Sequence, residues 1–201
     1  MKTIVVLSSW SSGSTAISGF LDKCGSYSCP PHQITNDPRT PNAYEPLEYR
    51  NILAGIIDEF SLEPKNNLSK FQDFFSPWLL VQHSKAAAAG ATSIVLKHPL
   101  QAFFIEEIVN VCNPILLVVT RPFEIIEKTR IRRRWPSTYG GQGAVKIYNQ
   151  IYSFLHNNNK SYLTIAYQEF KAKKQVQDSL INYCGLQPTD AQLQAAREWL
   201  V

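Results

Sequence analysis

The chain has few cysteines and only a small excess of charge of one sign. Its four cysteines, Cys24, Cys29, Cys112 and Cys184, include no Cys-x-x-Cys pair and no companion histidines at metal-ligand spacing. This scarcity argues against a disulfide framework and indicates a reduced, cytoplasmic protein with buried thiols and no metal. The net charge of +4 is too small to imply nucleic acid as a partner.

Long apolar runs are also missing. No segment approaches the ~20 apolar residues that a membrane-spanning helix requires. The apolar run after Met1 stops at Leu7, too short for a secretory signal, and no cleavage site follows. With 201 residues, 44% of them apolar, the chain can bury an ordinary core without a metal or a disulfide. No repeat or linker divides it, so we expect residues 1–201 to form one domain without a membrane span.

The opening segment is the most informative part of the chain. Residues 4–7 are apolar and mostly β-branched, residues 8–15 are rich in Ser and Gly, and residues 16–24 have helical apolar spacing. A strand, a loop and a helix N-terminus in this order form an anion site, because the first helical N–H groups are unpaired. No Lys follows Gly13, as the ATP-binding motif would require. The segment predicts a phosphate or sulfate site; a plain Ser-rich cap before a core helix is the alternative.

Strand-like and helical segments alternate along the rest of the chain. Further strands are predicted at 93–97, 115–120 and 162–167. Helices are predicted at 45–60, 68–89, 100–111, 123–134, 144–156, 176–184 and 190–200, with a Pro-rich connection at 29–46 and a Gly-rich break at 140–143. This alternation predicts an α/β fold with a central parallel sheet flanked by helices on both faces and ligands at the carboxyl ends of the strands.

Polar side chains gather at those predicted strand ends. Lys97 and His98 follow one strand, Arg121 follows another, and the Ser-rich loop follows the first. If the strands are neighbours, these groups converge on one site. A second basic feature, with arginines at 130, 132, 133 and 134, predicts either a solvated helix face or an anion site.

Three motifs resemble those of the sulfotransferases that use 3′-phosphoadenosine 5′-phosphosulfate. Residues 11–15 are similar to the family's 5′-phosphosulfate loop, and Arg121 with Thr129 eight positions later resembles its 3′-phosphate site. Residues 163–170 and 183–186 resemble its closing strand and its Phe-Leu-Gly-Leu ending. The resemblance covers about residues 3–187 and implies a three-layer sandwich like that of the P-loop nucleoside triphosphate hydrolases.

The resemblance also implies which residues bind the donor. The 5′-phosphosulfate would be held by Ser11, Ser12, Gly13, Ser14 and Thr15. Arg121 and Thr129 would hold the 3′-phosphate, and Tyr167 would complete the donor site. Trp10 is either an adenine-stacking residue or a core residue beside the loop.

The acceptor hydroxyl must lose a proton as it attacks sulfur, and the sequence offers two candidate bases. Glu45 lies in residues 41–46, which resemble the Gly-Tyr-Phe-Glu segment of bacterial members. His98 lies in Lys97-His98-Pro99, which resembles the Lys-Thr-His segment of the cytosolic branch. Both candidates stay open at this point. The alternative for His98 is a capping or packing role, and the alternative for Glu45 is a solvated or helix-capping carboxylate.

Ser11 departs from the family pattern, which places Arg or Lys at this position to stabilise charge on the leaving group. Removing such a donor can cost about 10²-fold or more in rate. Lys97, at the adjacent strand end, is the first candidate substitute, and the arginines of 130–134 are the second.

The sequence therefore predicts a sulfotransferase that moves a sulfuryl group from 3′-phosphoadenosine 5′-phosphosulfate to a hydroxyl or amine of a small-molecule acceptor. Adenosine 3′,5′-bisphosphate would be the other product, and no metal is needed because positioning and fixed positive charge can carry the transfer. Two alternatives remain: a catalytically inactive nucleotide-binding module, which Ser11 favours, and a small P-loop phosphotransferase, which the missing loop Lys disfavours. The acceptor and the oligomeric state stay open.

Overall fold

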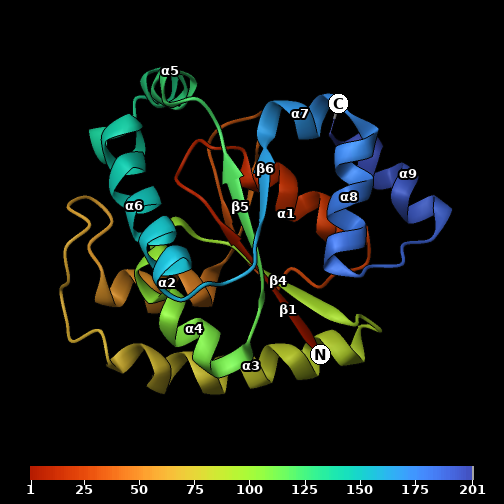
Figure 1. The fold of residues 1–201 in the computed structure, drawn as a ribbon, viewed down its shortest axis with the longest axis horizontal. Coiled ribbons are helices and arrows are strands. Elements are labelled where there is room, and N and C mark those ends of the chain that lie inside the picture. The colour runs from red at the N-terminus through yellow and green to blue at the C-terminus, as the bar shows by residue number, and fades with distance from the viewer. Residues whose placement is uncertain (201) are drawn as a thin grey trace.

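The computed structural model describes residues 1–200 and places a four-stranded sheet at the centre of the molecule (Figure 1). Its strands are β1 (Lys2–Leu7), β4 (Ser93–Leu96), β5 (Ile115–Thr120) and β6 (Leu163–Ala166), in the order β4-β1-β5-β6. All three pairings are parallel, with Val5 beside Leu96 and Leu7 beside Val118. The predicted central parallel sheet is therefore confirmed.

Helices cover both faces of this sheet, which makes three layers (Figure 1). One face carries α1 (Ser14–Lys23), α7 (Tyr167–Ala172), α8 (Lys174–Cys184) and α9 (Asp190–Trp199), and the other carries α2 (Leu47–Ile56), α3 (Lys70–Ala88), α4 (Ile105–Cys112) and α6 (Gly141–Asn157). The helix α5 (Phe123–Arg133) follows β5 at the carboxyl edge of the sheet.

Each face of the sheet has its own apolar core. In β1, Ile4 and Val6 belong to the cluster under α1 and α8, whereas Val5 and Leu7 belong to the cluster under α2, α3 and α6. These four side chains have no exposed surface. Because a strand alternates its side chains between faces, a continuous apolar run is what a sheet covered on both faces requires.

The Pro-rich connection contains a hairpin that the sequence did not predict. Its strands are β2 (His32–Ile34) and β3 (Asn42–Pro46), so Glu45 lies in a strand and α2 begins only at Leu47. The predicted helix over 45–60 is thus too long at both ends, since α2 stops at Ile56. Pro46 occupies the N-cap of α2, where a missing N–H removes no helical hydrogen bond.

Two other predicted boundaries also differ. The expected helix at 100–111 is split into a 3-10 segment, η1 (Pro99–Phe104), and α4, because the His98 ring accepts the Leu100 N–H and starts a tighter turn. The Gly-rich break at 140–143 is short, since α6 already begins at Gly141. Gly143 belongs to that helix, and a Cβ there would lie 1.8 Å from the Thr138 carbonyl oxygen.

The predicted ends of the last two helices are confirmed. Gly185, with φ 60°, ends α8 in the left-handed region, and Thr189 starts α9 with a capping box completed by Gln192. The four cysteines are free thiols, three of them buried. Within residues 1–200, no helix combines the length and apolar character needed to cross a membrane.

Candidate functional site

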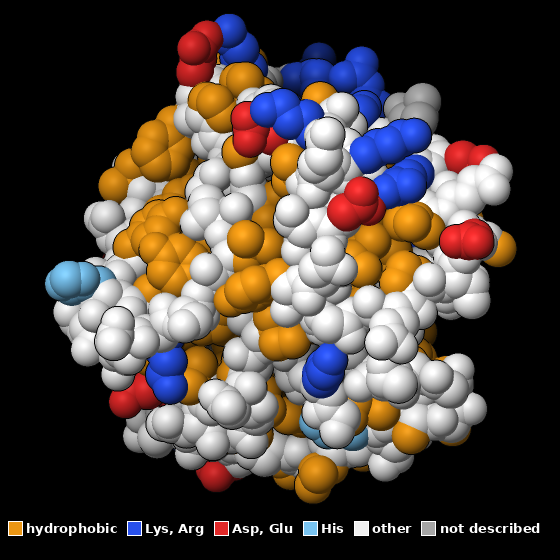
Figure 2. Space-filling view, turned by 45° about the vertical axis from the view of Figure 1, so that its right-hand side comes forward, with side chains coloured by type: hydrophobic (Ala, Val, Ile, Leu, Met, Phe, Trp, Pro, Cys, Tyr) orange, Lys and Arg blue, Asp and Glu red, His pale blue; other side chains and the backbone are white. Residues whose placement is uncertain are grey.

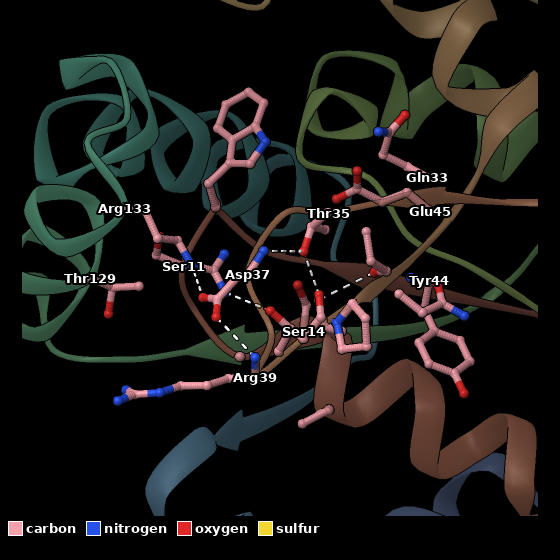
Figure 3. Close-up of a pocket in the computed structure, with 18 of the residues that line it drawn as sticks. Ser11, Ser14, Gln33, Thr35, Asp37, Arg39, Tyr44, Glu45, Thr129 and Arg133 are labelled. Carbon is pink, nitrogen blue, oxygen red and sulfur yellow. Dashed lines mark hydrogen bonds and ion pairs between the residues drawn. The ribbon is translucent and has the colours of Figure 1, made fainter.

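A cavity of about 1150 Å³ opens at the carboxyl ends of the strands, where the sheet is expected to bind ligands. Its wall is formed by the β1–α1 loop, the β2–β3 hairpin, the residues that follow β4 and β5, and the facing side of α5. In Figure 3, Thr129 of α5 and Glu45 of the hairpin lie on opposite sides of this cavity, with Ser11 and Ser14 between them.

The β1–α1 loop presents the N-terminus of α1 to the cavity. Ser11 (φ 61°) and Gly13 (φ 95°) adopt left-handed conformations, and no side chain caps the helix at Gly13. The first N–H groups of α1 are therefore left for a ligand, and the helix dipole favours an anion there. Ser11, Gly13, Ser14 and Thr15 line the cavity. Ser12 does not: its hydroxyl is buried and donates to the Ser9 carbonyl oxygen at 2.7 Å, so it holds the loop in shape.

Tyr167 packs against this loop. A Cβ added to Gly13 would lie 2.3 Å from the Tyr167 ring, so the ring occupies the space that any other residue would need. The Arg121 guanidinium lies over the same ring, 5.0 Å from its centre. Tyr167 therefore holds the loop and Arg121 in fixed relation, in addition to lining the cavity.

Arg121 joins the end of β5 to the loop and to α5. Its Nη1 donates to the Ser11 carbonyl oxygen at 3.1 Å and to Thr129 Oγ1 at 3.4 Å. Within residues 1–200, neither Arg121 Nε nor Ser11 Oγ has a hydrogen-bond partner, although both atoms are buried. Burial lowers the pKa of Arg121 from its usual value. Arg121 and Ser11 both line the cavity, so Arg121 and the loop form one side of it together.

Lys97, after β4, connects the loop to Glu45. Its Nζ lies 2.6 Å from Glu45 Oε1 and also donates to the Ala43 carbonyl oxygen (3.1 Å) and to Thr15 Oγ1 (3.3 Å). Both charged groups are buried, yet both line the cavity. Burial is the largest single influence on the pKa of Glu45 and acts to raise it. The charge and hydrogen bond of Lys97, together with the other basic groups nearby, outweigh burial, so the pKa lies below its usual value.

A local backbone turn explains the direction of the Glu45 side chain. The Tyr44 N–H donates to Asn42 Oδ1 at 2.7 Å, and Tyr44 has φ 52°. This turn interrupts the alternation of β3, so that residues 43–46 are all buried. Glu45 thereby faces Lys97 at the carboxyl edge of the sheet.

His98 lies behind this pair and outside the cavity wall. Its Nδ1 accepts the Leu100 N–H at 3.2 Å, so the neutral ring carries its proton on Nε2. That Nε2 lies 3.5 Å from Glu59 Oε1 and 3.8 Å from Glu45 Oε2. The ring is 1% exposed, and its only basic nitrogen is already occupied by a backbone donor.

Charged and aromatic groups form the wall around Glu45. Glu59 accepts from Arg50 at 2.7 Å, and both line the cavity. Tyr139 stacks on Trp10 with ring centres 4.3 Å apart. Trp10 is 9% exposed and belongs to the apolar core, so little of its ring is left for an adenine. Burial, followed by the charge of Glu59, raises the pKa of Tyr139 well above its usual value.

The arginine cluster of α5 is divided between two surroundings. Arg132 and Arg133 line the cavity, where both bind Asp37 of the hairpin loop, whereas Arg130 pairs with Glu127 outside it. Lys and Arg side chains gather toward the top of the face shown in Figure 2, with acidic side chains among them. The cavity therefore has a strongly basic side at α5 and a side with paired charges at Glu45.

The predicted convergence of three strand ends is confirmed, because Arg121 contacts Ser11 and Lys97 contacts Thr15. The cavity also contains functional groups that no sequence motif indicated: Arg50, Glu59, Asp37 and Tyr139. The only local signal among them is the acidic pair Asp58-Glu59, which does not show that this segment meets the strand ends. Among residues 1–200, no group of three His, Cys, Asp or Glu side chains is placed to hold a metal ion.

The sheet, its helical layers and the loop at the end of β1 together define a sulfotransferase-like fold. The chain is similar in structure to the sulfotransferase STF9 from Mycobacterium avium, with a TM-score of 0.56. The two share 16% sequence identity over 99% of this chain and 67% of that one, so the similarity establishes the fold. No family model matches the sequence, and no curated protein matches it.

Proposed function

We propose that the protein transfers a sulfuryl group from 3′-phosphoadenosine 5′-phosphosulfate to a hydroxyl or amine of a small-molecule acceptor. The observation that carries this proposal is the cradle that the uncapped N-terminus of α1 forms with Arg121 and Lys97 at the cavity wall. A cradle of this kind fits an anion with several acceptor oxygens, and the sulfotransferase-like fold supports a phosphosulfate nucleotide as that anion.

The donor would lie along the carboxyl edge of the sheet. The N–H groups at Gly13, Ser14 and Thr15 would bind the 5′-phosphosulfate, and Arg121 with Thr129 would bind the 3′-phosphate. Ser12 would contribute its backbone only, because its hydroxyl is bonded within the loop. The Arg121 fork suits a phosphate because it offers parallel N–H donors.

Lys97 would replace the cation that Ser11 does not supply. Its ammonium already touches the loop at Thr15 and lies between the loop and Glu45. Arg132 and Arg133 are less suited to this role, since their contacts are with Asp37 and Thr40 of the hairpin and not with the β1–α1 loop. A buried ammonium at the leaving oxygen would stabilise negative charge as it develops there.

We assign Glu45 as the base and His98 as a residue that positions it. Glu45 lines the cavity and its low pKa keeps it ionised, whereas His98 lies behind it with Nδ1 occupied. The acceptor oxygen would form a bond to sulfur as the bond between sulfur and the 5′-phosphate oxygen breaks. The acceptor proton would pass to Glu45, leaving a sulfate ester and adenosine 3′,5′-bisphosphate.

Lys97 would also couple binding of the sulfuryl donor to the basicity of Glu45, because its ammonium contacts both the loop and Glu45. In the ligand-free protein, Lys97 lowers the pKa of Glu45 against the effect of burial. A bound phosphosulfate attracts the same ammonium, and any weakening of the pair lets burial raise the pKa of Glu45. Glu45 would thus become a stronger base only when the donor is in place.

Sulfate transfer to a panel of hydroxyl and amine acceptors tests this proposal. We expect turnover by the wild type and its loss in both Glu45→Gln and Lys97→Ala. Glu63→Gln is the matched control, because Glu63 is an exposed glutamate outside the cavity wall. Binding of the bisphosphate without turnover on any acceptor would instead support an inactive nucleotide-binding module.

A further inference from the structure

We propose that Arg132 and Arg133 form a second anion subsite, for a phosphate- or sulfate-type dianion, which the chain's own Asp37 carboxylate fills when no ligand is bound. This inference deepens the proposed function by adding a competitor to the same cavity. It depends on residues other than the loop and Arg121, so it can be tested separately.

Asp37 binds both arginines through one oxygen. Its Oδ2 accepts from Arg133 Nε at 2.7 Å and from Arg132 Nη2 at 2.9 Å. The second donor of the Arg133 fork, Nη2, reaches Thr40 Oγ1 at 2.6 Å in the same loop. Two guanidinium groups thus donate to one carboxylate oxygen, with a hydroxyl beside it. A phosphate group has the acceptor oxygens to bind the same two guanidinium groups. Figure 3 shows Asp37 directed toward Arg133, on the Thr129 side of the cavity.

The charge balance of this side favours a dianion over the carboxylate. Arg121, Arg132 and Arg133 all line it. Burial, with a smaller contribution from Arg132 and Arg121, lowers the pKa of Arg133 even though Asp37 acts to raise it. Asp37 supplies a single negative charge against these three. A ligand with two negative charges therefore gains more from the cluster than the carboxylate does.

The loop that carries Asp37 is a compact unit that can leave the arginines without unfolding. The Thr40 N–H donates to the Asp37 carbonyl oxygen at 2.9 Å, and Thr35 Oγ1 donates to the Thr40 carbonyl oxygen at 2.5 Å. Arg39 N–H donates to Asp37 Oδ1 at 3.0 Å. These contacts are internal, whereas the bonds to Arg132 and Arg133 tie the loop to α5. A ligand needs to break only the latter.

Arg133 is held in place independently of Asp37. Its guanidinium lies 4.4 Å from the centre of the Trp135 ring, which keeps the fork at the cavity wall when the carboxylate leaves. The Arg133 half of the subsite is therefore preorganised, and Asp37 acts as an intramolecular competitor. Such a competitor lowers the apparent affinity for a ligand by the fraction of molecules in which the subsite is free.

Titration of wild type and Asp37→Asn with inorganic pyrophosphate and with adenosine 3′,5′-bisphosphate tests the proposal. Asn keeps an oxygen for the Arg39 N–H but carries no charge, so we expect pyrophosphate to bind about tenfold more tightly. If Asp37→Asn also binds the bisphosphate more tightly than wild type does, a nucleotide phosphate enters the subsite. If only pyrophosphate binding tightens, the anion of the subsite comes with the acceptor. Both results support the subsite.

Asp178→Asn is the matched control, since Asp178 pairs with Arg197 at 2.6 Å outside the cavity wall. Unchanged or weaker pyrophosphate binding by Asp37→Asn would overturn the subsite and make Asp37 an anchor of the loop. Failure of the bisphosphate to bind either protein would count against the proposed function, while the pyrophosphate result would still decide the subsite.

Trypsin cleavage after Arg39, an exposed residue of the loop, gives a second readout that needs no variant. Pyrophosphate should speed this cleavage in the wild type by releasing the loop from α5. Slower or unchanged cleavage on adding pyrophosphate would contradict displacement of Asp37.

Discussion

Lys97 and Glu45 form a buried ion pair, with Nζ 2.6 Å from Oε1, that joins the phosphate-type loop to the proposed acceptor side of the cavity. Their side chains are 5% and 9% exposed, so neither charge is well solvated. Nevertheless both line the cavity, where a ligand can reach them. A pair that is shielded from solvent but open to substrate can respond to a bound anion far more than a surface pair can.

The first prediction concerns the stability of this pair. Lys97→Ala leaves an uncompensated buried carboxylate and should lower the free energy of unfolding by about 3 kcal/mol. The double variant Lys97→Ala/Glu45→Gln removes the charge and should recover a large part of that loss. Urea unfolding measures both, and a double variant no more stable than the single one would contradict a buried, coupled pair.

The second prediction separates the two candidate bases. Glu45→Gln should lower kcat by about 100-fold without weakening bisphosphate binding, because the Lys97 ammonium is then released from the carboxylate and stays at the loop. His98→Asn should cost less, because Asn can still accept the Leu100 N–H and His98 does not line the cavity. Steady-state kinetics on both variants decides the assignment; a larger loss in His98→Asn would make His98 the base.

The third prediction concerns the loop glycine. Gly13→Ala combines a left-handed backbone with a Cβ 2.3 Å from the Tyr167 ring, so it should reduce bisphosphate affinity and stability together. Gly90→Ala is the matched control: its φ of 75° is also left-handed, but the space around it is open, so it should cost only about 1 kcal/mol. Equal costs for the two variants in urea unfolding would show that the Tyr167 contact does not constrain the loop.

The fourth prediction concerns how the free energy of unfolding falls at low pH, and assigns part of that fall to Asp37. Burial acts to raise the pKa of Asp37, but the Arg39 N–H and the Arg132 guanidinium lower it from 3.8 to about 2. A depressed folded-state pKa contributes stability that is complete above the unfolded value and is lost as pH falls toward 2. Unfolding measured between pH 5 and pH 2 should therefore show a flatter decline in Asp37→Asn than in wild type. Parallel curves would mean that the two arginines do not stabilise the carboxylate.

The sequence was sufficient for features that depend on local patterns. The buried strand at Ile115–Thr120, the stop at Gly185 and the cap at Thr189 follow from apolar runs and from residues with special backbone preferences. The meeting of Ser11, Lys97 and Arg121 followed from one further rule, that neighbouring parallel strands end at the same edge.

The remaining features depend on contacts between distant segments. Glu45 was expected where the Pro-rich connection meets the start of a helix, but the Asn42 turn and the pairing of His32 with Pro46 place it in a strand. Asp37 lies in a loop with no motif, and only the fold brings it to Arg133, 96 positions away. The sequence also could not predict which serines of the loop face the cavity. Ser12 and Ser14 have similar local sequence, yet the Ser12 hydroxyl is bonded within the loop and Ser14 lines the cavity.

Calorimetry of the wild type with adenosine 3′,5′-bisphosphate and with ATP tests the central claim most directly. We predict that the bisphosphate binds without Mg²⁺ and more tightly than ATP, and that Arg121→Lys, which keeps the charge but loses the fork, weakens it about tenfold. Arg197→Lys, outside the cavity, should leave binding unchanged. Tighter binding of ATP that requires Mg²⁺ would contradict the account and favour a phosphotransferase.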